Sequence, residues 1–155
     1  MSIIIAEGFY MDNNKDTILL LKECSAGIRM AVASIDDVLP FLEDGEVKQV
    51  LKESKTEHKD LEKDIDNALH KMNCEGKEPN LMAKSMSKIK TNAEMAFKPN
   101  ASQAASLITD GCGMGIKSIH KYMNQYPAAS SEVMNLANRI STLEAKLEDQ
   151  MKPFL

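Results

Sequence analysis

The stretch that decides the fold is residues 46–72, EVKQVLKESKTEHKDLEKDIDNALHKM. Its inner positions recur at alternating steps of four and three residues, which keeps their side chains on one face of a helix. These positions are Val47, Leu51, Ser54, His58, Leu61, Ile65, Ala68 and Met72. Residues 73–76, NCEG, and then Pro79 follow, as is typical where a helix ends. The stretch therefore predicts one long amphipathic helix.

Three other stretches repeat this spacing and predict three more long helices. Their inner positions are Ile18, Leu21, Ser25, Ile28, Val32, Ile35, Leu39 and Leu42 in the first, Ala101, Ala105, Ile108, Cys112, Gly115, Ile119, Tyr122 and Tyr126 in the second, and Val133, Leu136, Ile140, Leu143, Leu147, Gln150 and Phe154 in the third. The earliest should begin near Asn13 to Asp16, and it should end or kink at Pro40, which cannot donate to the helix ladder. Ser130 and Ser131 can cap the last helix.

A shorter helix, over about residues 80–97, should separate the second and third long helices. Its apolar side would be formed by Met82, Met86, Ile89, Ala93 and Phe97. The expected fold class is all-α, a four-helix bundle with a short helical crossover between helices two and three. Such a crossover can return the chain along the bundle, so helices two and three would run parallel; a strictly alternating bundle is the other possibility. We expect residues 1–14 to form a loose arm and 15–155 a single domain.

Composition limits the function classes. The chain has 155 residues and a net charge of −4, which disfavours binding to nucleic acid. Its three cysteines are widely spaced and form no CxxC pair, so reduced thiols and a cytoplasmic location fit better than a disulfide framework or a zinc site. No apolar run is long enough to span a membrane. The partner that we expect is therefore protein rather than nucleic acid or a lipid core.

Three short segments, residues 20–24 (LLKEC), 109–117 (TDGCGMGIK) and 143–147 (LEAKL), together with the order of helices, make the chain resemble the ferritin-like superfamily. The resemblance covers residues 15–155 and is closest to small bacterial rubrerythrin-related bundles of unknown function. It implies a core that can hold two metal ions, with a Glu from each of two helices and a Glu-x-x-His motif from each of the others.

The inner positions of this chain depart from that ligand pattern. The first helix has Ser25 at an inner position, and Glu23 lies off the seam, the line of inner positions along the helix. The second offers His58, with Lys55 three residues before it. The third offers Cys112, and on the fourth Glu144 is expected to flank the seam. We therefore predict no di-iron site, no catalytic residues and no cofactor.

Two groups of residues are the site candidates. Ser54, Glu57 and His58 form a candidate polar core cluster, in which a neutral imidazole would bond to Ser54, to a backbone carbonyl or to Glu57. A ligand or catalytic role for His58 is the alternative. Gly111 and Gly115 are candidate close-packing glycines, since glycine inside a helix costs about 1 kcal/mol relative to alanine and needs a compensating reason. A local kink that opens a ligand pocket is the other reading.

The predicted function is a non-catalytic bundle that acts through association, as a structural, stress-related or interaction protein. Apolar residues beside or off the seams favour a homodimer. They are Leu19, Leu20, Met30, Val50, Leu69 and Met134. The alternative is a metal-dependent oxidoreductase or iron-handling protein of the ferritin-like type. A third possibility is that lysines at 77, 84, 88, 90 and 98 bind a membrane surface or an acidic partner.

Overall fold

The computed structural model describes the backbone of residues 2–79, 88, 90–95 and 100–155, and the side chains of these ranges from residue 15 onward. The described residues are mostly helical and contain no strand, so the all-α prediction is confirmed. The long helices among them are α1 (Ser2–Val38), α2 (Glu46–Lys71), α4 (Ala101–Gln125) and α5 (Ser131–Met151). Short 3-10 helices follow α1 at Leu39–Phe41 and α5 at Lys152–Phe154.

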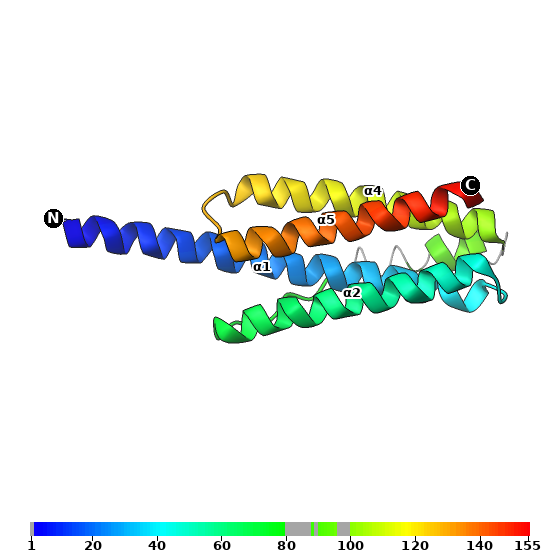
Figure 1. The fold of residues 1–155 in the computed structure, drawn as a ribbon, viewed down its shortest axis with the longest axis horizontal. Helices are drawn as coiled ribbons and strands as arrows, with labels where there is room; N and C mark the ends of the chain where they lie inside the picture. The colour runs from blue at the N-terminus through cyan, green and yellow to red at the C-terminus, as the bar shows by residue number, and fades with distance from the viewer. Residues whose placement is uncertain (1, 80–87, 89, 96–99) are drawn as a thin grey trace.

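The long helices form two antiparallel hairpins, α1–α2 and α4–α5, which lie side by side (Figure 1). Helix α2 packs against α1 and α5, and α4 packs against the same two helices. Helices α2 and α4 run in the same direction (Figure 1). This is the direction predicted from the crossover, rather than strict alternation. We refer to α1, α2, α4 and α5 together as the helical body.

Only part of the predicted crossover helix falls within the described residues. Residues 88 and 90–95 are helical. Ala93, predicted on the apolar side, is exposed, whereas Met95 is fully buried, so that part of the prediction is wrong. The remaining apolar positions of that prediction, Met82, Met86, Ile89 and Phe97, lie outside the described residues.

The ends of the helices follow local chemistry. Helix α1 ends at Val38, and Pro40 lies in the 3-10 helix that follows, so the predicted helix end at Pro40 is confirmed. Asn100 caps α4 by accepting from the Gln103 backbone N–H, and Ser130 caps α5 by accepting from that of Val133.

The predicted start of the first helix, near Asn13 to Asp16, is wrong. Helix α1 already begins at Ser2, and its first turns extend beyond the ends of the other helices (Figure 1). Asp16 serves another purpose, because its carboxylate accepts from the Ala128 N–H at 3.0 Å. Beside it, the Thr17 hydroxyl accepts from the Ser130 N–H at 2.8 Å. These two bonds fasten the turn between α4 and α5 to α1. The division into an arm and a domain stays a prediction.

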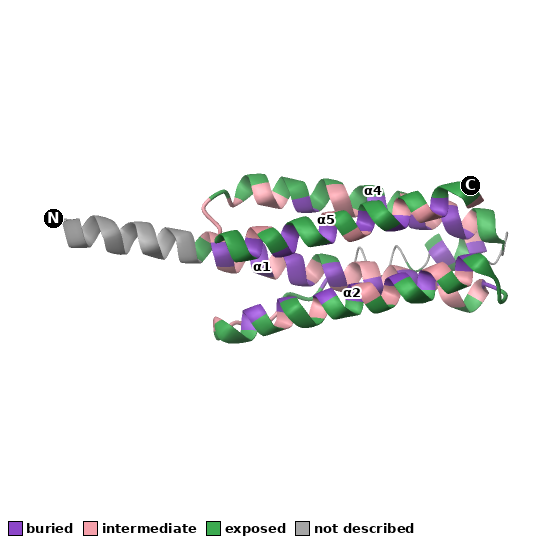
Figure 2. Cartoon of the chain, viewed as in Figure 1, coloured by how far each residue is buried: buried purple, intermediate pink, exposed green. Residues whose placement is uncertain are grey.

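The apolar core has two parts along the helical body, and the buried residues face the neighbouring helices (Figure 2). One part contains Leu21, Leu61 and Ile140, and the other contains Ile35, Leu51 and Leu147. Most predicted inner positions are buried, including all those within α2, whereas Met72, which follows α2, is half-buried.

Two residues that had been placed off the seams are also buried. Leu20 and Leu69, at 0% and 2% exposure, belong to the core rather than to an outer stripe. In contrast, Leu19, Met30, Val50 and Met134 are half-buried. The apolar surface that favoured a homodimer is therefore smaller than the sequence indicated.

Arg29 ties the two helices of the first hairpin to the segment that follows α2. Its guanidinium lies 3.7 Å from the carboxylate of Glu62 and 3.3 Å from that of Asp66, both on α2, and it also pairs with Glu78. Close to this network, Gly76 passes so near α1 that a Cβ there would stand 2.7 Å from the Ser25 hydroxyl oxygen.

Candidate functional site

The interior of the helical body contains one close contact between ionisable groups of α2 and α5. His58 is fully buried and Glu144 is 4% exposed. The imidazole Nε2 of His58 lies 2.9 Å from Oε1 of Glu144. On the other side of the ring, Nδ1 lies 2.7 Å from the Ser54 carbonyl oxygen and 3.3 Å from the Ser54 hydroxyl. Both ring nitrogens of His58 thus have partners inside the protein.

The helical period brings these groups together. Ser54 and His58 are four residues apart, so the imidazole lies over the preceding turn and its Nδ1–H can donate to the Ser54 carbonyl. On α5 the buried positions near the pair are Ile140, Glu144 and Leu147. Along both helices the pair lies between the two apolar parts of the core. It is a polar interruption in an otherwise apolar seam.

The second hairpin leaves room for the Glu144 carboxylate at Gly115. A Cβ built on Gly115 would lie 3.4 Å from Oε2 of Glu144, at the limit of ordinary contact. Gly115 therefore does approach another helix, but the neighbour is the side-chain carboxylate of Glu144 rather than a helix backbone. Gly111 is exposed, and a Cβ there would meet no atom within 4 Å, so the prediction of close packing at Gly111 is wrong.

The surroundings favour a proton on the pair. Burial of the ring acts against its charged form, but the hydrogen bond to Glu144, the charge of that carboxylate, the Ser54 carbonyl and the charge of Glu57 outweigh it. The pKa of His58 is consequently raised above its ordinary 6.5. An imidazolium with both N–H groups donating, one to the Ser54 carbonyl and one to the Glu144 carboxylate, satisfies every polar atom of the ring.

The buried cysteine thiols are held in the protonated form. Burial raises the pKa of the Cys112 thiol, and the charge of Glu144 and a hydrogen bond to it raise it further. Burial, followed by the charge of Glu23, raises the pKa of Cys24 to about 12. Because the thiolate is the reactive form, both groups behave as small core residues.

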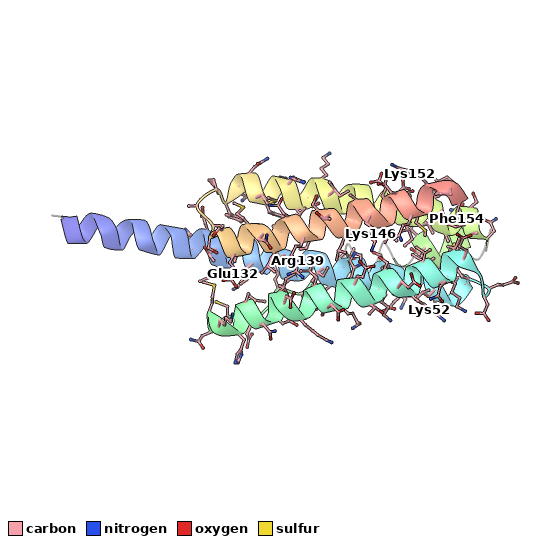
Figure 3. All side chains as sticks on the ribbon, viewed as in Figure 1. Lys52, Glu132, Arg139, Lys146, Lys152 and Phe154 are labelled. Atoms are coloured by element: carbon pink, nitrogen blue, oxygen red, sulfur yellow. The ribbon has the colours of Figure 1, made fainter. Side chains whose placement is uncertain are left out.

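The predicted cluster of Ser54, Glu57 and His58 is brought together only in part. Glu57 turns away from His58 to the surface, where its carboxylate accepts from Lys146 of α5 at 2.7 and 2.9 Å. The acidic partner of His58 is instead Glu144, which had been expected to flank the seam. Lys146 and Arg139 mark the side of α5 that faces α2 (Figure 3), and Arg139 pairs there with Asp64 at 2.7 Å.

This arrangement differs from a metal-binding core. In the part of the chain that the structure describes, no three His, Cys, Asp or Glu side chains are grouped so that they could hold an ion. Between α2 and α5 lies a groove of about 480 Å³. Acidic and basic side chains line it, together with the amides of Asn67 and Asn135. It lies toward the Arg139 end of the interface, away from Glu144.

Comparison of the chain with family models, with curated proteins and with solved structures finds no match. Within the described residues, no helix has the length and apolar character needed to cross a membrane.

Proposed function

We propose that the chain is a ferritin-like four-helix bundle that acts through association, without catalysis and without a di-iron site. The order of its helices supports the architecture, because two antiparallel hairpins in which α2 and α4 run parallel correspond to a bundle with one long crossover. The free thiols of Cys24, Cys74 and Cys112 support a reducing, cytoplasmic location.

The observation that carries the proposal is the closed arrangement around His58. Its Nδ1 is bonded to the Ser54 carbonyl and its Nε2 to Glu144, so neither nitrogen is left for a ligand or a substrate. The equivalent depth of α4 offers Cys112, whose raised pKa keeps it protonated, and Gly115, which has no side chain. A polar group built in this way ties helices together, as buried polar groups in cores commonly do.

A second copy of this chain is the partner that we favour. The first turns of α1 extend beyond the other helices (Figure 1), and residues 2–14 read SIIIAEGFYMDNN, in which more than half are apolar. Most of the stability of a helix in a protein comes from packing of its apolar face, and a second copy could cover such a face here. Met114 on α4, with 72% of its surface exposed, is an exposed apolar residue on a different helix and serves as a comparison for this segment.

Light scattering on the full chain tests this proposal. We expect twice the mass of the 17.2 kDa chain at high micromolar concentration. Ile5→Lys with Phe9→Lys should give the monomer mass with unchanged circular dichroism of the helical body. Met114→Lys is the matched change on α4 and should leave the dimer intact. A monomeric wild-type chain at high micromolar concentration contradicts the dimer, and loss of the dimer in Met114→Lys alone moves the interface to α4.

Ferrous loading distinguishes the proposal from its alternative, a metal-dependent oxidoreductase or iron-handling protein. Anaerobic addition of ferrous ion should leave less than one iron per chain after desalting, and admission of oxygen should produce no ferroxidase activity. Two irons per chain, with a shift of the His58 ring signals in NMR spectra, would overturn the function proposed here.

A further inference from the structure

The contact between His58 and Glu144 joins the two hairpins through their interior. Helices α1 and α2 are connected by a short turn, as are α4 and α5, and the two hairpins meet each other along α1–α4, α2–α5 and α1–α5. We propose that this contact is a proton-dependent latch on the α2–α5 interface. With one proton held between Nε2 and Oε1 the interface is closed, and loss of that proton at alkaline pH loosens it.

The geometry gives the latch its dependence on the proton. The Nδ1–H of His58 is directed at the Ser54 carbonyl 2.7 Å away, and this carbonyl can only accept. A single remaining proton on the ring therefore stays on Nδ1. Nε2 would then present a lone pair to a carboxylate oxygen at 2.9 Å, so neither atom would have a donor. A buried carboxylate that faces a lone pair and keeps only the weak thiol donor of Cys112 is unfavourable, and separation of α2 from α5 would relieve it.

Among the residues that the structure describes, the lysines nearest to the pair are already bound to other acids. On α4 the neighbour of Glu144 is the Cys112 thiol, and Glu148 of α5 adds negative charge near it. On α2 the nearest acid is Glu57, which binds Lys146 at the surface. On the α1 side, Asp36 binds Lys55 of α2, also toward solvent. Lys55 and Lys146 are thus already paired with carboxylates outside the core.

The other ion pairs between α2 and α5 contribute little to the stability of the interface. Lys146–Glu57 and Arg139–Asp64 join side chains that are 41–49% exposed, and exposed ion pairs typically contribute about 0–1 kcal/mol. The apolar contacts on either side of the pair keep the helices folded, whereas the contact at Glu144 responds to pH. Loosening would first admit water to Cys112, because this thiol lies beside Glu144.

The sign of the pH dependence follows from the raised pKa of His58. The unfolded chain titrates near 6.5, so the contribution of the pair is fully present below about pH 6.5 and is lost as the pH rises through the higher folded value. Acidification toward pH 6 should therefore tighten the α2–α5 interface. Alkaline solution should loosen it without melting the helices.

Thiol labelling of the native chain from pH 6 to 10 tests the latch. The labelling rate of Cys112, read by peptide mass spectrometry and divided by its rate in the unfolded chain, should rise about tenfold for each unit by which the folded pKa exceeds 6.5. Cys24, in the other part of the core, should stay protected and report any global unfolding. Glu144→Gln can donate to Nε2 of a neutral ring and should abolish the rise, whereas Glu57→Gln should retain most of it.

A direct titration keeps the proposal testable if Glu144→Gln does not fold. The ring nitrogens of His58 can be followed by NMR in the wild-type chain, where we expect a midpoint above 6.5 and a shared proton on Nε2. A midpoint at or below 6.5, or a rise in Cys112 labelling that Cys24 matches, would overturn the latch. Either result would leave the proposed association untouched, because the oligomeric state is measured separately.

Discussion

Replacing Gly76 with alanine should destabilise the protein by about 1–3 kcal/mol, the usual cost of overpacking a close contact. A Cβ at this position would stand 2.7 Å from the Ser25 hydroxyl oxygen and 2.9 Å from a terminal nitrogen of Arg29. The backbone of Gly76 does not have a positive φ, so space rather than backbone strain decides the outcome. Ser25 is short and fully buried, and Arg29 is held by the carboxylates around it, so neither atom can move away freely.

Urea unfolding measures this change. With a slope of about 2 kcal/mol per molar urea, the midpoint should fall by about 0.5–1.5 M while the slope stays constant. The matched variant is Ser25→Ala. The hydroxyl of Ser25 is buried and has no hydrogen-bond partner among the described residues, so its removal alone should stabilise the protein by about 1 kcal/mol.

The double variant completes a thermodynamic cycle. Gly76→Ala with Ser25→Ala should recover about 1 kcal/mol more than the two single changes predict by addition, because the closest clash is gone. If Gly76→Ala unfolds at the wild-type midpoint, the close approach of this segment to α1 is refuted. If the cycle is additive within about 0.5 kcal/mol, the clash with Ser25 is not the cause of the loss.

Three other changes test separate features of the fold. Asp16→Ala should lower the free energy of unfolding in urea by about 1 kcal/mol, because the Ala128 N–H loses its acceptor; an unchanged midpoint would argue against this tie. Gly113→Ala should raise the melting temperature by the equivalent of up to about 1 kcal/mol, since its Cβ would meet no atom within 4 Å; a lower melting temperature would contradict the open helix face. At pH 8 the half-buried Cys74 should react with Ellman's reagent first, whereas Cys24, with a pKa of about 12, should react only on unfolding, and equal rates would disprove this order.

The inner face of α2 could be predicted from the sequence, whereas the inner face of α5 could be predicted only in part. For α5 the sequence favoured a strict heptad through Ile140, Leu143 and Leu147. The buried positions from Val133 to Met151 instead follow the 3.6-residue period of a straight helix, which drifts from a heptad and brings Glu144 inward. Because the apolar Leu143 precedes Glu144, the sequence favoured Leu143 as the inner position. The His58 partner was missed for that reason.

The other errors arise from contacts between distant residues. Asp16 carries the sequence signal of a helix start, but its carboxylate binds the turn after α4, and α1 continues through it. Gly111 and Gly115 look alike in sequence, yet only Gly115 faces another side chain, because α4 turns Gly111 toward solvent. Local patterns predicted the helices and their order. They could not determine which neighbouring helix, if any, each position meets.

The division into two hairpins also shapes how the protein emerges from the ribosome. The first hairpin is complete once residue 71 has been made, but the helices that cover its inner face end at residue 151. At about 5–20 residues per second the nascent hairpin waits about 4–16 s with that face open to water. Ser54 and His58 lie in the middle of the open face, where they interrupt the apolar surface available to other nascent chains. His58, whose contact with Glu144 ties α2 to α5 in the finished protein, would thus also lower the risk of aggregation during synthesis.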